Sequence, residues 1–240
     1  MVVANAMRSR GRVALVAGIP VTRAISWGPL AGGSVIALAV VASLRVRDAG
    51  AASLIGGLRI GAVLLAAGAA FALDDPAATT LASSPTPLST RRSLRLALSL
   101  SACFATWIVM LRIAGDPSHP AAAGLSLEAA GMVAVALAAA SVAAPSMPNG
   151  LGGLAGGPTL VCFLLAAIIV QQYWPRWALL TLPGTPAWMS AHLRWLVLAG
   201  ASSILVALAA LDPARRLVTW RRRSPSGVHP LARRRTRPCG

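Results

Sequence analysis

The 240-residue sequence contains no lysine and only six acidic residues, so arginine supplies all 22 of its basic side chains. Charged residues make up 12 % of the chain, whereas a soluble domain contains about 25 %. The missing lysine excludes a phosphate-binding P-loop, because that loop needs a lysine to reach the nucleotide phosphates. We therefore expect no ordinary ATPase site in this chain.

The signatures of membrane hydrolases are also missing. There is no H-E-x-x-H sequence, which a zinc peptidase would need. An intramembrane serine protease needs a serine and a histidine within reach of each other, but we place His119 and His192 in outer loops and His229 in the tail. Without C-x-x-C spacing, Cys103 and Cys162 are expected to act as small apolar residues. We expect no catalytic residue, metal site or cofactor.

Long apolar runs make up most of the remaining sequence. Hydrophobic residues account for 56 % of the chain and the mean hydropathy is +0.70. A helix of about 20 apolar residues crosses a bilayer, so we predict an all-α, polytopic membrane protein. Its six transmembrane helices are predicted at residues 24–44, 49–73, 94–113, 125–144, 158–173 and 196–211. Gly57 and Gly61, and the many small residues of the fourth helix, predict close helix packing.

The arginines are distributed unevenly around these spans. With both termini in the cytoplasm, sixteen arginines lie on the cytoplasmic side and five on the outer side, as the positive-inside rule requires. We therefore predict a multi-pass protein of the plasma membrane with a six-helix domain at 24–211. A basic interfacial segment at 1–23 and a basic cytoplasmic tail at 212–240 flank it. We interpret the net charge of +16 as suited to contact with anionic lipid headgroups, not to nucleic-acid binding.

Few polar residues fall inside the predicted spans. Arg59 is a possible intramembrane polar site, about one turn inside the outer boundary when about 20 residues are counted back from Leu73. We favour snorkelling or a structural pairing for Arg59 over a substrate contact. We place the acidic residues at span ends: Asp48, Asp116 and Glu128 outside, and Asp74, Asp75 and Asp212 inside. Ion-coupled carriers usually place carboxylates at mid-membrane, so an energy source outside the chain is favoured.

The longest polar break in the apolar pattern covers residues 74–92. Asp75 is a suitable helix N-cap and Pro76 suits the first helical position, so we predict a short helix that ends before Pro85 and Pro87. An ordinary solvated loop is the alternative. Leu81 and Leu88 have no local apolar partner, which favours docking of this helix onto a cytoplasmic protein.

Three stretches give a family resemblance. FALDDPAATTLASSPTPLSTRRSLRL after the second span, WPRW…LPGTPAWMSAHLRW on the outer side and the closing ALDPARR resemble small type-2 ABC exporter permeases of actinobacterial kind. The resemblance implies two six-span permease halves, as a homodimer or heterodimer, with separate ATPase subunits that bind ATP and magnesium. It also implies that 75–88 is the coupling helix, that 1–23 is an elbow helix and that 174–195 is an outer re-entrant region. The partner-binding residues it implies are Asp75, Pro76, Thr79, Thr80, Leu81, Pro85, Pro87 and Leu88.

Two functions follow as hypotheses. The first is the transmembrane permease subunit of an ATP-binding cassette exporter, which moves an amphipathic or hydrophobic cargo with the help of a separate ATPase. The second is a non-transporting membrane scaffold or accessory subunit that anchors a cytoplasmic partner through the same loop. The tryptophans at 174, 177, 188 and 195 are expected at headgroup depth, in a surface or re-entrant helix.

Overall fold

The computed structural model describes residues 26–74, 88–115, 119–147 and 151–211, apart from the side chains of 88–92, 119–120 and 210–211. These residues form six helices long and apolar enough to cross a membrane, and they contain no strand. The helices are α2 (Trp27–Val46), α3 (Ala51–Ala70), α4 (Leu88–Ala114), α5 (His119–Ala143), α6 (Gly153–Tyr173) and α7 (Trp188–Leu211). Short 3₁₀ turns extend α3 (η1, Phe71–Leu73) and α5 (η2, Ala144–Ser146), and a third (η4, Pro175–Trp177) follows α6. The prediction of an all-α polytopic membrane protein is confirmed.

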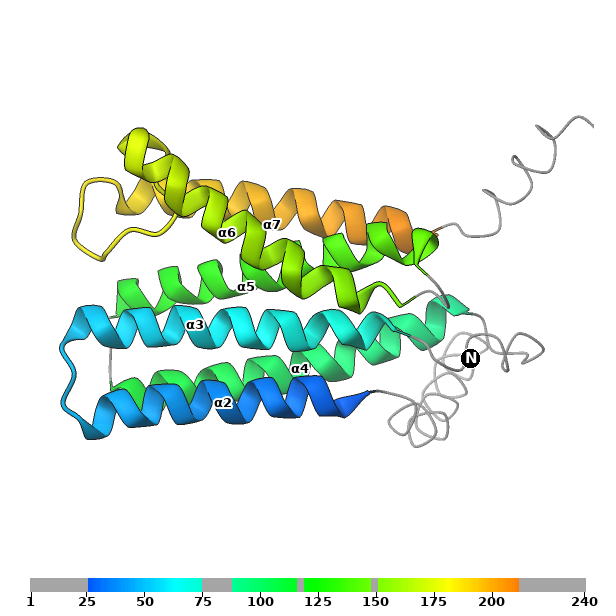
Figure 1. The fold of residues 1–240 in the computed structure, drawn as a ribbon, viewed down its shortest axis with the longest axis horizontal. Helices are drawn as coiled ribbons and strands as arrows, with labels where there is room; N and C mark the ends of the chain where they lie inside the picture. The colour runs from blue at the N-terminus through cyan, green and yellow to red at the C-terminus, as the bar shows by residue number, and fades with distance from the viewer. Residues whose placement is uncertain (1–25, 75–87, 116–118, 148–150, 212–240) are drawn as a thin grey trace, which may run out of the picture.

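The six helices run up and down in one bundle (Figure 1). The start of α2 and the end of α7 lie at the same end of the bundle, which we call the terminal end. The connections α3–α4 and α5–α6 also lie there, whereas α2–α3, α4–α5 and α6–α7 are joined at the opposite, far end. Residues 75–87 therefore leave and rejoin the bundle at the terminal end.

Helix α3 is the centre of the bundle. Half of its spanning window is buried, more than in any other described helix, and α2, α4, α5 and α6 all pack on it, while α7 packs mainly on α5. A Cβ atom added to Gly57 would lie 2.5 Å from Leu44 Cδ1, and one added to Gly68 would lie 2.8 Å from the Leu30 Cα. The predicted close packing through small residues is confirmed, since these glycines let α2 approach α3.

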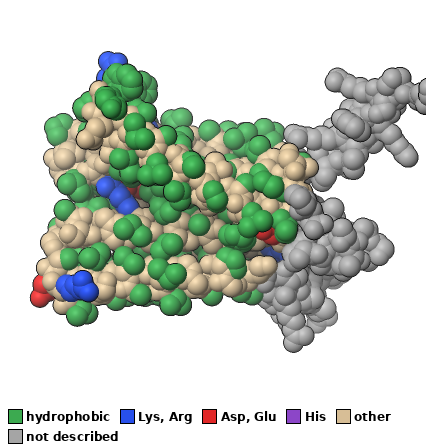
Figure 2. Space-filling model, in the orientation of Figure 1, with side chains coloured by type: hydrophobic (Ala, Val, Ile, Leu, Met, Phe, Trp, Pro, Cys, Tyr) green, Lys and Arg blue, Asp and Glu red, His purple; other side chains and the backbone are tan. Residues whose placement is uncertain are grey.

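Outside this core the bundle is covered by apolar side chains. Figure 2 shows hydrophobic side chains along the whole length of the helices, with few charged side chains on the face in view. Leu, Ile, Val and Phe side chains such as Phe104, Ile169 and Val197 are more than half exposed. A soluble protein rarely exposes so much apolar surface, and hydrocarbon chains of a bilayer are the solvent that suits it.

Helix ends near glycine, proline and tryptophan were predicted less well. Four helices begin five to eight residues earlier than predicted: α4 at Leu88, α5 at His119, α6 at Gly153 and α7 at Trp188. The gap of 145–157 between the fourth and fifth predicted spans is too long, because Gly153 and Gly156 are helical. A Cβ on Gly153 would lie 2.7 Å from the Phe71 Cα, so the absence of side chains lets α6 begin against α3.

Candidate functional site

A salt bridge lies between α3 and α5, inside the membrane-spanning part. Arg59 Nε donates to Glu128 Oε2 at 2.8 Å and Arg59 Nη2 donates to Glu128 Oε1 at 3.0 Å. Arg59 Nη2 also donates to the carbonyl oxygen of Thr181, which belongs to the loop between α6 and α7. The side chain of Glu128 is 1 % exposed and that of Arg59 is 15 % exposed. The bidentate geometry and the extra carbonyl satisfy most of the polar atoms of the buried pair.

The depth of this pair corrects two predictions. Arg59 is eight residues into the span that begins at Ala51, and Glu128 is seven residues into the span that begins at Ala121. At 1.5 Å per residue both lie roughly 10–12 Å from the starts of these spans. Glu128 therefore does not lie at a span end, and Arg59 does not snorkel to the surface. The structural pairing that was the other interpretation of Arg59 is what the geometry shows.

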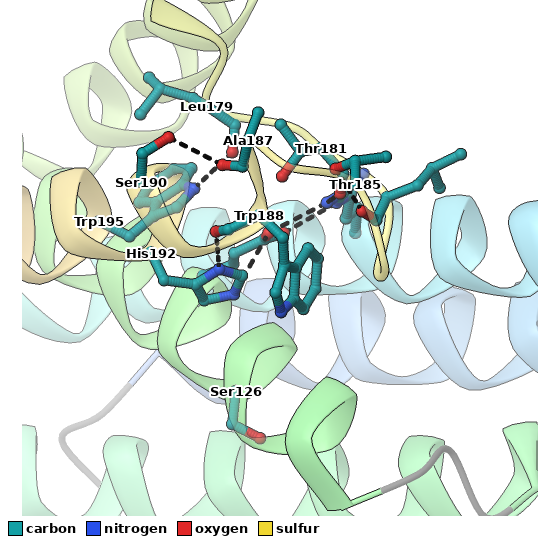
Figure 3. Close-up of polar contacts among 12 residues, drawn as sticks. Ser126, Leu179, Thr181, Thr185, Ala187, Trp188, Ser190, His192 and Trp195 are labelled. Atoms are coloured by element: carbon teal, nitrogen blue, oxygen red, sulfur yellow. Dashed lines mark hydrogen bonds and ion pairs between the residues drawn. The ribbon is translucent and has the colours of Figure 1, made fainter.

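His192 completes the group from α7. Its Nε2 atom lies 3.8 Å from Glu128 Oε1, and its Nδ1 atom lies 2.6 Å from the carbonyl oxygen of Trp188. The imidazole lies beside the Trp188 ring, with centroids 4.1 Å apart and planes tilted by 56°, and Figure 3 shows both rings beneath the connection between α6 and α7. His192 was predicted in a loop, but it is a buried residue of α7. We call Arg59, Glu128, Thr181 and His192 the polar cluster.

The connection of residues 174–187, which we call the far loop, is fixed to α7 by side chains of that helix. Arg194 donates to the carbonyl oxygens of Ala178 and Arg176, and Trp195 Nε1 donates to Leu179 O at 2.9 Å. Trp195 is completely buried among protein atoms. Two turns of α7 at Trp188 occupy the second half of the predicted surface or re-entrant segment. These bonds hold the far loop over the polar cluster.

An apolar groove of about 550 Å³ runs along the bundle between α4 and α7. We call it the lateral groove; α3 and α5 form its floor, and α4 and α7 form its walls. Trp107 on α4 reaches across to α5, where its Nε1 donates to Ser126 Oγ at 3.0 Å. Residues that represent the four helices are Leu65, Phe104, Trp107, Val133, Ser203 and Val206. Its volume lies within the range of about 300–1,000 Å³ that small-molecule pockets usually have.

A second polar contact joins three helices at the terminal end. Asp74 follows η1, is 5 % exposed, and accepts a hydrogen bond from the backbone N–H of Gly153, the first residue of α6, at 2.7 Å. Arg95 of α4 donates to the carbonyl oxygen of Asp74 at 3.1 Å. Burial raises the pKa of the Asp74 carboxyl above its ordinary value, and the Gly153 N–H opposes this rise. Asp74, the residue just before segment 75–87, is thus hydrogen-bonded to α4 and α6.

The predicted partner-binding residues mostly lie outside the described part of the chain. Asp75, Pro76, Thr79, Thr80, Leu81, Pro85 and Pro87 are not described, and Leu88 is the first residue of α4 with its side chain not described. The predicted elbow segment 1–23 and tail 212–240 also lie outside it.

Sequence reasoning missed Glu128 as the partner of Arg59 and His192 as the residue that faces Glu128. Opposite charges inside two predicted spans were the available signal for the first, while nothing in the sequence pointed to the second. In the described residues, no group of three or more His, Cys, Asp or Glu side chains is arranged to hold a metal ion. Comparisons of the chain with protein-family models, with curated proteins and with solved structures found no match.

Proposed function

We propose that the chain is the transmembrane permease subunit of an ABC exporter in the plasma membrane, working with a separate ATPase subunit. The observation that carries the proposal is the attachment of segment 75–87 to the bundle. Asp74, at its start, is bonded to Gly153 of α6 and to Arg95 of α4. A protein that grips this segment from outside the membrane therefore acts on α3, α4 and α6 together.

The proposed orientation places the terminal end in the cytoplasm. Three arginines, at 91, 92 and 95, follow the segment directly, and the tail beyond α7 is rich in arginine. The positive-inside rule favours this arrangement. It gives segment 75–87 access to a cytoplasmic ATPase, which supplies the energy that the chain, lacking a P-loop lysine, does not provide itself.

The lateral groove supports an amphipathic or hydrophobic cargo. Its walls, α4 and α7, make few direct contacts with each other, so the groove lies along the surface that lipid chains would cover. Most of its lining is alanine, leucine, valine, phenylalanine and tryptophan, with Ser126 and Ser203 as polar points. Such a surface stabilises an apolar cargo through burial of its surface, whereas a hydrophilic ion would lose its hydration without compensation.

The test is copurification of the chain with a P-loop ATPase from its own cells, followed by reconstitution. Leu81→Asp and Leu88→Asp should each weaken the association, because burying an unpaired carboxylate at an apolar contact costs several kcal/mol. A loss of about 3 kcal/mol corresponds to more than a 100-fold increase in Kd. Leu231→Asp, the same substitution in the predicted tail, is the matched control and should leave the Kd unchanged.

Two outcomes would contradict the proposal. If no P-loop ATPase associates with the chain, or if the two loop variants bind it as tightly as the control, segment 75–87 is not a coupling element. If the ATPase binds but ATP hydrolysis moves no amphipathic compound across reconstituted vesicles, the chain is instead a membrane scaffold.

A further inference from the structure

In the polar cluster, His192 Nε2 and Glu128 Oε1 face each other with no hydrogen bond between them. We call these two atoms the acceptor pair. The imidazole of His192 is 8 % exposed and lies among charged groups from two other helices. The charged groups that face it are Glu128 from α5 and Arg59 from α3, and the far loop adds the uncharged Thr181. In the described chain, α4 and α6 place no charged side chain against it, and Arg194 of α7 is directed to far-loop carbonyls instead.

The hydrogen bond to Trp188 determines which ring nitrogen carries hydrogen. A carbonyl oxygen only accepts, so His192 Nδ1, at 2.6 Å from Trp188 O, must be the N–H donor. In the neutral ring Nε2 then has a lone pair and no hydrogen. This buried nitrogen makes no hydrogen bond within the described residues, and it faces the carboxylate oxygen Oε1 of Glu128 at 3.8 Å.

Gly124 keeps this side of the ring open. It lies one turn before Glu128 on α5, and a Cβ atom added there would collide with His192 Nε2 and lie 2.7 Å from Trp188 Cζ2. A larger residue would force the two rings away from α5. The absence of a side chain at this position is therefore part of what brings Nε2 and the Glu128 carboxylate to one place.

We propose that His192 and Glu128 form a proton-binding site within the membrane-spanning part, and that the bound proton joins α7 to α5. One proton from the aqueous phase adds to His192 Nε2, and no other bond breaks. The acceptor pair becomes a charge-assisted N–H···O hydrogen bond, for which the heavy atoms lie about 2.7–2.9 Å apart. The net charge of the cluster changes from zero to +1, with Arg59 still bonded to the Glu128 carboxylate.

This inference does not depend on an ATPase partner. In the protonated state α3, α5 and α7 are linked by one continuous set of hydrogen bonds through Glu128. In the deprotonated state α7 loses its bond to Glu128, and only the far loop connects it to Arg59. The site thus makes the association of α7 with the rest of the bundle dependent on pH.

The experiment uses the full-length chain in lipid nanodiscs with His192 as its sole histidine, obtained with His119→Gln and His229→Gln. Nitrogen-15 NMR of labelled histidine reads the protonation of each ring nitrogen. At high pH we expect hydrogen on Nδ1 alone, and at low pH on both nitrogens. In Glu128→Gln no carboxylate faces Nε2, so the charge-assisted N–H···O signal expected at low pH in the wild type should be absent. Hydrogen on Nε2 at high pH, no second proton at low pH, or the same low-pH spectrum in Glu128→Gln would each overturn the proposal.

If Glu128→Gln does not fold, a second measurement still tests the proposal. The melting temperature of the wild type and of His119→Gln should rise as pH falls from 8 to 5.5. In His192→Gln this rise should be smaller, because its amide can donate to Glu128 at every pH, and the part that remains belongs to other groups such as Asp74. An unchanged pH dependence in His192→Gln would refute the proton site.

Discussion

The ion pair of Arg59 and Glu128 provides a test of whether the bundle is held by a buried charge. We consider Arg59→Met, which keeps an unbranched side chain and removes the guanidinium. Glu128 would lose donors at 2.8 and 3.0 Å while its side chain stays 1 % exposed. Removing one partner of a buried salt bridge costs about 3–5 kcal/mol, because the other charge is left uncompensated.

The expected change is large enough to measure in a detergent or nanodisc melting experiment. For a chain of this size each kcal/mol shifts Tm by about 2–4 °C, so Arg59→Met should lower Tm by roughly 6–20 °C. The double variant Arg59→Met, Glu128→Leu removes both charges. Its Tm should return to within a few degrees of the wild type, since an apolar pair of similar volume is often as stable as a buried salt bridge. Arg47→Met, at an exposed arginine, is the control and should change Tm little.

The double variant decides the outcome. If the drop in Tm of the double variant equals the sum of the drops of Arg59→Met and Glu128→Leu measured alone, the two residues are not coupled. The contact between α3 and α5 then does not depend on charge pairing. If Arg59→Met has the same Tm as the control Arg47→Met, Glu128 has another partner or is not buried.

Two further predictions concern packing and the terminal end. Gly131→Ala should cost about 1–3 kcal/mol in thermal unfolding, because a Cβ there would lie 2.5 Å from Trp195 Cε3, whereas Gly200→Ala, with open space around it, should cost nothing. Asp74→Asn keeps an acceptor for Gly153 but has no charge. Because burial raises the pKa of Asp74 above 3.8, its contribution to stability is fully present below that pH and is lost as pH rises through the raised value; Tm of Asp74→Asn should not show this fall.

The number and type of helices could be predicted because their signal is local. Each span is a long apolar run, and the middle of each predicted range coincides with an observed helix. The starts of α6 and α7 could not be predicted, because Gly153 and Trp188 favour a turn or an interface by themselves. They are helical because Gly153 packs against α3 and Trp188 packs against His192, contacts that depend on tertiary structure.

The polar cluster could be predicted only in part. Its members are separated by 69 residues between Arg59 and Glu128 and 122 residues between Arg59 and Thr181, so no local pattern brings them together. Snorkelling and a structural pairing of Arg59 could not be separated from the sequence, because its partners lie on α5 and in the far loop. Arg59 does not need to reach water when Glu128 and a far-loop carbonyl satisfy it.

The two walls of the lateral groove are attached to the bundle differently, and this bears on how the groove would open. Helix α7 packs on α5, and at the far end His192 faces Glu128 and Trp195 holds the far loop. Helix α4 is joined at the terminal end, where Arg95 binds the carbonyl of Asp74, and again towards the far end, where Trp107 donates to Ser126 of α5. A force at the terminal end therefore acts first on α4, while α7 is held to α5 by packing and by the polar cluster. We infer that a pull at the terminal end changes the width of the groove, and that the protonation of His192 sets how firmly the opposite wall resists.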